Sequence, residues 1–476
     1  MIHQYKNNGY NIVLDVNSGM IHVVDDLAYD IIELYETNDK GSIVSAMVEK
    51  YTIPENMRLI TAGNDKDADF TENIESLVRQ IHEVIEDIEE LKKDGALFSA
   101  DVYENYIKDF KQRSTVVKAL CLHIAHDCNL ACRYCFAEEG EYKGDRSLMS
   151  LEVGKRALDF LIENSGSRRN LEVDFFGGEP LMNFDVVKEL VVYGRNLEKI
   201  HDKKFRFTLT TNGVLLNDEI MEFANQEMSN VVLSIDGRKE VHDFMRPSRN
   251  KKGSYDLILP KFQKLADSRN QTNYYVRGTF THHNLDFSED VAHLADLGFQ
   301  QISVEPVVAL EDEEYAIKEG DLPKLFQEYD KLAKLMLDRK KEGKDFNFFH
   351  FMIDLTGGPC VAKRLSGCGS GTEYLAVTPW GDLYPCHQFV GIPEYLMGNV
   401  FDGILKKEIR EEFRYCNVYA KDKCKDCFAK FYCSGGCAAN SYKFHGSIND
   451  AYDIGCELQK KRVECAIMLK AAAQET

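Results

Sequence analysis

The chain has 476 residues and carries 78 acidic against 58 basic side chains, which gives a formal net charge of −20. This length exceeds one ordinary hydrophobic core and predicts several domains. So acidic a surface repels phosphate backbones, which argues against nucleic-acid binding. No apolar run is long enough to span a membrane, and the first residues lack the pattern of a secretion signal. We therefore expect a soluble, cytoplasmic protein with no nucleic-acid or membrane partner.

The first 95 residues form a predicted N-terminal domain. Alternating apolar residues from Asn11 to Val24 surround Asn17-Ser18-Gly19, which is typical of a hairpin. Helices are expected at Leu27–Tyr35 and Ile43–Tyr51. A long amphipathic helix follows, with apolar residues at Ile74, Leu77, Ile81, Ile85, Ile88 and Leu91 and a stop at Gly95. A hairpin with helices resembles a winged helix, and a packing or dimerisation domain is the alternative.

After a linker at 96–115, residues 116–310 alternate between short apolar strands and helices. The expected strands are Val116–Ile124, Leu171–Phe176, Phe205–Thr210, Asn230–Ile235, Tyr274–Phe280 and Gln301–Val307, and the expected helices include Val153–Ile162, Val186–Ile200 and Asp256–Leu265. Six βα repeats predict an α/β fold with a parallel sheet, either open or curled into an incomplete barrel, because a closed barrel needs eight. A helical bridge at 311–359 leads to a cysteine-rich domain at 360–476.

Fourteen cysteines are the most informative feature of the sequence. A chain without a secretion signal is not expected to build a disulfide framework, so clustered cysteines predict bound metal. Cys128, Cys132 and Cys135 have the spacing C-x3-C-x2-C directly after the first barrel strand. Structural zinc prefers four ligands and is the alternative, whereas a [4Fe–4S] cluster held by three thiolates keeps one iron open. Cys121, on the strand itself, is expected in the core.

With Tyr134 before its third cysteine, this motif resembles the radical S-adenosylmethionine (SAM) superfamily. The resemblance implies a partial (β/α)6 barrel in which SAM binds the open iron and is cleaved to methionine and a 5′-deoxyadenosyl radical. Gly177, Gly178 and Glu179 follow the second strand and match the segment that binds the SAM amino group. The other implied SAM contacts are Tyr134, Asn212, Ser234, Asp236, Arg246 and Val307. A turn cap at Asp236 and a surface ion pair at Arg246 are the alternatives.

The second cysteine cluster resembles the SPASM extension of radical SAM peptide-modifying enzymes, and zinc-ribbon binding is the alternative. The resemblance implies two auxiliary [4Fe–4S] clusters, and therefore three clusters in all. An outer cluster would be held by Cys424, Cys427, Cys433 and Cys456, and an inner one by Cys368, Cys386 and Cys437. Cys360 would complete the inner set, or that iron would stay open to a substrate thiol. Cys416 and Cys465 fit no ligand pattern and are expected to be packed thiols.

The residue after Cys386 is His387, a weak catalytic candidate. Sulfatase-maturing enzymes, which oxidise a Cys or Ser residue to formylglycine, have an aspartate base there. No other catalytic residue is assigned. The sequence therefore lacks, at position 387, the aspartate of the sulfatase-maturing enzymes. Formylglycine formation is kept as the second candidate reaction.

The opening segment, from Gly9 to Tyr35, resembles the leader-recognition element of ribosomal-peptide maturases. Such elements add an extended leader peptide to a sheet edge. A DNA-binding winged helix is the alternative, but it needs a basic recognition helix, and this region is acidic at Asp25, Asp26, Asp30 and Glu33.

The whole chain resembles the maturases of SCIFF peptides (six cysteines in forty-five residues). The resemblance implies thioether cross-links between a cysteine sulfur and the carbon of an acceptor residue in a cysteine-rich precursor peptide, with flavodoxin or ferredoxin as electron donor. An iron–sulfur electron carrier without SAM chemistry is a third reading.

Overall fold

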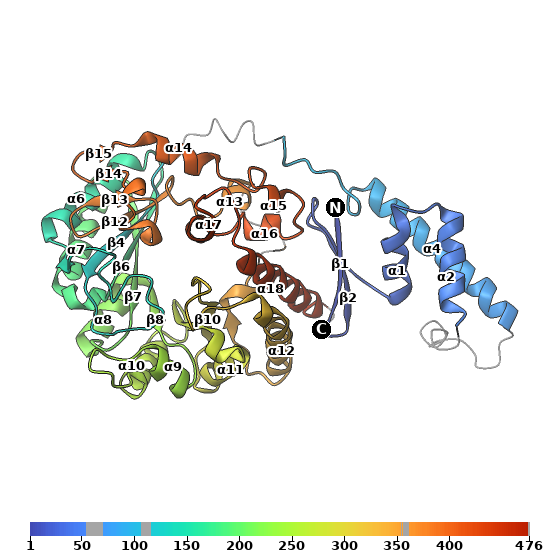
Figure 1. The fold of residues 1–476 in the computed structure, drawn as a ribbon, viewed down its shortest axis with the longest axis horizontal. Helices are drawn as coiled ribbons and strands as arrows, with labels where there is room; N and C mark the ends of the chain where they lie inside the picture. The colour runs from blue at the N-terminus through green and yellow to red at the C-terminus, as the bar shows by residue number, and fades with distance from the viewer. Residues whose placement is uncertain (54–69, 106–115, 354, 356–360, 475–476) are drawn as a thin grey trace. The chain divides into compact units, whose positions relative to one another are not determined.

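The computed structural model describes residues 1–53, 70–105, 116–353, 355 and 361–474, which Figure 1 draws in colour. The chain divides into two compact units. The first combines the N-terminal segment with the end of the chain from Val463, and the second holds the parallel sheet and most of the cysteine-rich region. Among the described residues, no helix combines the length and the apolar character that crossing a membrane requires.

The first unit begins with a three-stranded antiparallel sheet of β1 (Ile2–Asn7), β2 (Tyr10–Asp15) and β3 (Ile21–Val24), in that order. The predicted hairpin is β2–β3, and its turn is closed where Asp15 N donates to Met20 O at 2.9 Å. The helices α1 (Asp26–Tyr35), α2 (Lys40–Tyr51) and α4 (Phe70–Lys93) follow the sheet. The hairpin and the helices are confirmed, and the winged-helix comparison stays a prediction.

The apolar face of α4 packs against α1 and α2 to form the core of this unit, as its periodicity predicts. Leu77, Ile81, Ile85 and Ile88 are all buried there. The end of the last helix, α18 (Asp453–Ala472), also belongs to the unit, because Tyr5 OH donates to Glu464 O at 2.9 Å. The sequence placed this stretch with the C-terminal domain, since nothing local signals that it packs on β1.

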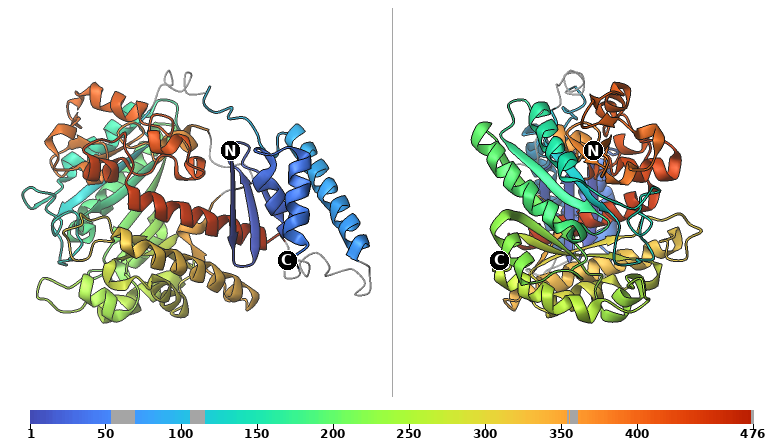
Figure 2. Two further views of the ribbon diagram at one scale, coloured as in Figure 1. Left: turned by 45° about the vertical axis from the view of Figure 1, so that its right-hand side comes forward. Right: turned by 90° about the vertical axis from the view of Figure 1, so that its left-hand side faces the viewer.

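In the second unit, six parallel strands lie side by side in chain order, as predicted (Figure 1). They are β4 (Ala119–His126), β6 (Asn170–Gly177), β7 (Lys204–Thr211), β8 (Met228–Ser234), β9 (Tyr274–Phe280) and β10 (Gln301–Pro306), and β11 (Asn347–Phe348) extends them. The helices between them are α6 (Leu151–Asn164), α7 (Phe184–Ile200), α8 (Asp218–Glu227), α9 (Lys239–Met245), α10 (Tyr255–Ser268) and α11 (Phe287–Asp296), with α12 (Leu322–Lys341) in the bridge. Figure 2 shows these helices on the outer side of the curved sheet.

The cysteine-rich region continues the same sheet. Strand β12 (Tyr374–Val377) pairs in parallel with β4, and β13 (Asp382–Tyr384), β14 (Gly398–Asn399) and β15 (Gly403–Ile404) follow in antiparallel order. Five short helices complete the region, and two of them contain a cysteine, Cys424 on α15 and Cys433 on α16: α13 (Val361–Ser366), α14 (Lys407–Tyr415), α15 (Asp422–Lys425), α16 (Lys430–Cys433) and α17 (Ala438–His445). Backbone pairing of β12 with β4 thus attaches this region to the first barrel strand.

Candidate active site

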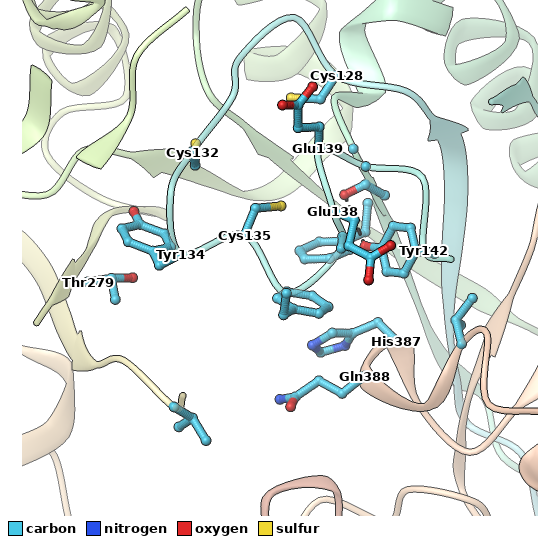
Figure 3. A pocket seen from close by; sticks show the side chains of 18 of the residues that line it. Cys128, Cys132, Tyr134, Cys135, Glu138, Glu139, Tyr142, Thr279, His387 and Gln388 are labelled. Carbon is cyan, nitrogen blue, oxygen red and sulfur yellow. Dashed lines mark hydrogen bonds between the residues drawn. The ribbon is translucent and has the colours of Figure 1, made fainter. Parts of the chain in front are cut away.

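One cavity of about 820 Å³ lies at the carboxyl ends of the parallel strands, where sites of such sheets are built. The loop after β4 contributes Cys128, Cys132 and Cys135, and the segment after β13 contributes His387 and Gln388. Figure 3 shows Cys135 and His387 entering the same space from these two segments. The cavity therefore joins the first cysteine motif to the segment that follows Cys386.

The three thiols of the first motif are free. Burial raises the pKa of Cys128 to about 11 and that of Cys132 to about 12, and neighbouring negative charge adds to the effect. Such thiols become thiolates when a bound cation supplies the compensating charge, as iron does. Within the described ranges, no three His, Cys, Asp or Glu side chains are gathered tightly enough to hold a single metal ion. A donor set of three cysteines on one loop fits a [4Fe–4S] cluster with one open iron.

The Gly177-Gly178-Glu179 segment is held against the cysteine loop. A Cβ atom on Gly178 would lie 2.1 Å from the carbonyl oxygen of Asp127, so only glycine allows this approach. Glu179 is fully buried, and its carboxylate accepts hydrogen bonds from Leu181 N, Thr211 Oγ1 and Asn212 N at 2.8–3.0 Å. Gly177 and Gly178 line the cavity, whereas Glu179 ties the ends of β6 and β7 together behind it. Its role toward an ammonium group stays a prediction.

Tyr134, Asp236 and Arg246 form one hydrogen-bonded group in the cavity wall. Tyr134 OH donates to Asp236 at 2.7 Å, and Arg246 Nη1 donates to Tyr134 OH at 2.7 Å. Burial raises the pKa of Asp236 to about 6, while the charge of Arg246 opposes it. Arg246 Nε is buried and has no hydrogen-bond partner in the described part of the chain. A buried donor of this kind calls for a bound acceptor, which fits the predicted SAM carboxylate.

The remaining predicted SAM contacts also line the cavity. Ser234 ends β8, and Val307 follows β10 and is 5% exposed. Asn212 Nδ2 donates to Asn129 Oδ1 at 2.7 Å and lies 3.6 Å from Cys128 Sγ. Asp236 is the one residue of its group that does not line the cavity, since it lies behind Tyr134 and Arg246.

His387 belongs to the opposite wall. Its ring contacts Phe136 and Phe176, with centroids 5.7 and 5.0 Å away, and its Nδ1 lies 3.4 Å from Tyr374 OH. Burial lowers the pKa of His387 to about 4, so the imidazole is neutral near pH 7. Cys386, directly before it, is buried and does not line the cavity.

The other cysteines gather in the two sets that the SPASM resemblance implies. Besides burial, Cys437 and Cys368 raise the pKa of the Cys386 thiol, so these three lie close together. In the second set, Cys433, Cys424 and Cys427 raise the pKa of Cys456, which burial brings to about 12. Whether these sets bind iron stays a prediction, and Cys360 lies outside the described residues.

The two cysteines without a predicted role have different surroundings. Cys416 donates to Ile448 O and interacts electrostatically with Cys424 and Cys368, so it lies beside both sets. Cys465 is buried in the first unit, where it accepts a hydrogen bond from Asn7 Nδ2 at 3.7 Å.

Sequence reasoning missed several residues that line the cavity. The clearest are Arg277 on β9 and Glu305 on β10, with Thr279 beside them. Alternation along β9 carried the signal, because Tyr274, Val276, Gly278 and Phe280 are buried while Arg277 between them is exposed. A charged residue inside a buried strand that faces a barrel interior points to a ligand.

Family models match two parts of the chain. The radical SAM superfamily model matches residues 122–296, and the SPASM iron–sulfur cluster-binding domain model matches residues 368–428. The protein is an enzyme with a radical SAM domain and a SPASM domain. These domains imply SAM and a [4Fe–4S] cluster, with auxiliary iron–sulfur clusters in the SPASM region.

Curated relatives include enzymes with different reactions. The radical SAM cyclopropyl synthase TigE of Paramaledivibacter caminithermalis is 23% identical over 72% of this chain and 72% of its own length. A cysteine-type anaerobic sulfatase-maturating enzyme of Clostridium novyi is 25% identical over 71% of this chain and 92% of its own length. This radical SAM enzyme therefore has relatives that modify peptides or proteins, but not one common reaction.

Two solved structures share its fold. The structure of anSMEcpe with bound AdoMet matches with a TM-score of 0.64 at 20% identity, over 76% of this chain and 96% of that one. The structure of Streptococcus suis SuiB bound to precursor peptide SuiA matches with a TM-score of 0.51 at 17% identity, over 96% of this chain and 98% of that one. The second match extends beyond the radical SAM and SPASM domains into the N-terminal region.

Proposed function

We propose that this radical SAM enzyme forms intramolecular thioether cross-links in a ribosomally made, cysteine-rich precursor peptide of the SCIFF type. The observation that carries the proposal is the single cavity that the first cysteine loop shares with the residues after Cys386. Its volume of about 820 Å³ lies near the upper end of the range for small-molecule sites, about 300–1,000 Å³. A substrate residue in this cavity would lie between the SAM motif and the inner cysteine set.

The proposed ligand sets are those of the sequence analysis: three cysteines for the SAM-binding cluster and the inner and outer SPASM sets for two auxiliary clusters. The chemistry that SAM and a reduced [4Fe–4S] cluster supply is hydrogen abstraction by a 5′-deoxyadenosyl radical. Arg246 would orient the SAM carboxylate through its unpaired Nε, and Tyr134 and Asp236 hold that guanidinium in place. Phe136 and Phe176 would keep water from the reacting carbon.

The N-terminal unit would bind the leader of the precursor peptide. Support comes from SuiB, whose structure is solved with its precursor peptide SuiA and whose match covers 96% of this chain. Among the residues that the structure describes, β3 has only β2 as a hydrogen-bonded strand neighbour, so its other edge offers a place for strand addition. Flavodoxin or ferredoxin would supply the electrons.

Formylglycine formation is the second candidate, because a sulfatase-maturating relative and the anSMEcpe structure are both similar to this chain. The identity of His387 favours the thioether reaction. Burial lowers the pKa of His387 to about 4, so this imidazole would be a poor general base near pH 7.

The test is anaerobic incubation of cluster-loaded enzyme with SAM, dithionite and a six-cysteine precursor peptide, followed by tandem mass spectrometry. A thioether maturase removes two hydrogen atoms for each cross-link, makes one thiol resistant to alkylation and forms 5′-deoxyadenosine. Oxidation of a cysteine to formylglycine removes sulfur from the peptide instead. Cluster-loaded enzyme that forms no deoxyadenosine would contradict both reactions.

Removal of the leader from the peptide tests the role of the N-terminal unit. We expect the KM of the shortened peptide to rise about 100-fold, because the tethering contribution of the leader is lost. Uncoupled SAM cleavage without peptide serves as the reference. An unchanged KM would contradict leader recognition.

A further inference from the structure

A second arginine–carboxylate pair lines the cavity. Arg277 lies on β9 and Glu305 on the neighbouring strand β10, and both side chains point to the cavity face of the sheet. Arg277 Nε donates to Glu305 Oε1 at 3.0 Å, and Nη2 donates to Oε2 at 2.8 Å. These two parallel hydrogen bonds fix the plane of both groups.

The pair is open to the cavity. The Arg277 side chain is 44% exposed and the Glu305 side chain 31% exposed. Arg277 Nη1 makes no hydrogen bond within the described part of the chain, so it offers two N–H donors. The carboxylate likewise keeps lone pairs that Arg277 does not use, and the nearest other cation candidate, His350 Nε2, is 3.9 Å from Oε1.

Both groups carry their charges across the range in which enzymes work. Burial would raise the pKa of Glu305, but the charge and hydrogen bonds of Arg277 outweigh it and hold the pKa at about 2. Burial and the charge of Arg462 lower the pKa of His350 to about 3, so this imidazole stays neutral beside the pair.

Fold stability does not explain the pair. Both side chains are partly exposed, and an ion pair in contact with solvent contributes little to stability. The neighbouring residues on the outer faces of the same strands, such as Val276 and Val304, are fully buried and apolar. On these two strands the charged pair therefore lies on the face that lines the cavity, where it can contact a ligand.

The position of the pair is central. The charge of Arg277 interacts electrostatically with Tyr134 and Arg246, which belong to the predicted SAM site. Both Arg277 and Glu305 also act on His387, on the wall that follows Cys386. The pair is therefore close both to the predicted SAM site and to the wall that carries His387.

We propose that Arg277 and Glu305 form a subsite for the main chain of the peptide substrate beside the residue that is modified. Arg277 donates to a substrate carbonyl oxygen, and Glu305 accepts from a substrate amide N–H. A donor and an acceptor side by side match one peptide unit and require no particular side chain. This subsite rests on the proposed function and deepens it, since one site can then present different residues of one peptide to the radical.

The test measures binding of a fluorescein-labelled core peptide, the six-cysteine precursor without its leader, to anaerobic holoenzyme with SAM. In the Arg277→Met, Glu305→Leu double variant, no charge is left unpaired, and we expect the Kd for the peptide to rise about 10- to 100-fold. The matched control is Arg156→Met, Glu163→Leu, because Arg156 and Glu163 form an exposed pair with two 3.0 Å bonds on α6. The control should bind the peptide as the wild type does.

A second variant and a second peptide sharpen the result. Arg277→Lys keeps the charge beside Glu305 but loses the parallel bonds, so the Kd should rise several-fold. A peptide with an ester in place of the amide at the modified residue lacks the N–H donor. It should bind more weakly to the wild type but no more weakly to the double variant, as expected for one shared interaction.

Two outcomes would overturn the subsite. One is an unchanged peptide Kd in the double variant, and the other is an equal rise in the Kd for SAM, which would assign the pair to SAM. Failure of the proposed function is distinguishable from both. In that case the core peptide binds through the pair, but the wild type forms no cross-link in it.

Discussion

The two walls of the cavity both come from cysteine-rich segments, yet they present different groups to it. The loop after β4 presents its thiols directly, at Cys128, Cys132 and Cys135. The segment after β13 sets Cys386 back and presents His387 and Gln388 instead. Cysteine spacing alone does not reveal this difference, because it predicts which thiols bind metal but not which of them meet a ligand.

The walls are joined by main-chain pairing and by one chain of side chains. Tyr374 on β12 pairs with Ala119 on β4, so the second wall is fixed to the first barrel strand. Tyr374 also hydrogen-bonds Cys121 and lies 3.4 Å from Nδ1 of His387. We therefore expect substitutions to have the largest effect at the thiols of the first wall, a smaller one where that wall is packed, and the smallest at this junction.

The largest effect is expected for Cys132→Ala. It removes one of the three thiols that hold the SAM-binding cluster, and no neighbouring thiol of the loop replaces it. We expect deoxyadenosine formation to fall to background with or without peptide, while the iron of the SPASM region remains. Quantification of deoxyadenosine and of iron per chain checks both statements.

Cys465→Ala is the matched control, because this cysteine is buried in the first unit and contacts Asn7. The control should retain SAM cleavage and its full iron content. Deoxyadenosine from Cys132→Ala at the level of the control would show that the SAM cluster has other ligands.

A smaller effect is expected for Gly178→Ala, which moves the first wall without removing a ligand. The added Cβ would lie 2.1 Å from Asp127 O, so the loop before Cys128 must shift. Misplacement by about 1 Å can cost 100-fold in rate, and we expect SAM cleavage to fall about 10- to 100-fold at equal iron content.

Gly144→Ala is the control for this change, since its Cβ would be 3.6 Å from the nearest atom, an ordinary contact. Equal rates in the two variants would mean that the loop adjusts without moving the thiols.

Secondary structure could be predicted where the local sequence pattern alone determines a strand or a helix. Strand β9 was predicted with its observed bounds, because its flanking turns and its β-branched and aromatic residues agree. The hairpin between β1 and β2 was missed, although Asn8-Gly9, with both φ angles positive, is a strong signal for such a turn. Packing of the end of α18 on β1 has no local signal at all.

Motifs predicted that Cys128 and Arg246 belong to one site, and both line the same cavity, while the ligand of each stays a prediction. Glu179 and Asp236 are both fully buried and do not line the cavity, and their contact with SAM stays a prediction. Arg277 and Glu305 belong to no motif, and only the pairing of β9 with β10 brings them together.

The smallest effect is expected at the junction of the walls, for Asp174→Asn. Burial and the charge of Glu172 raise the pKa of Asp174 to about 6, against the opposing hydrogen bond with Thr208. The pKa of Asp174 in the folded protein exceeds that of an unfolded aspartate, which is about 3.9. Its contribution to stability is therefore complete below about pH 3.9 and is lost as the pH rises through 6. The wild type should lose about 1–2 kcal/mol of unfolding free energy between pH 5 and 8 that the variant keeps.

Melting temperatures at pH 5.5, 6.5 and 8 measure this difference, with Asp202→Asn, whose carboxylate is 90% exposed, as the control. Parallel curves for Asp174→Asn and the wild type would contradict the raised pKa. Asp174 pairs in register with Cys121, which hydrogen-bonds the tyrosine beside His387. If Asp174→Asn is more stable than the wild type at pH 8 and forms cross-links at the same rate, the Asp174 carboxylate affects stability and takes no part in the reaction.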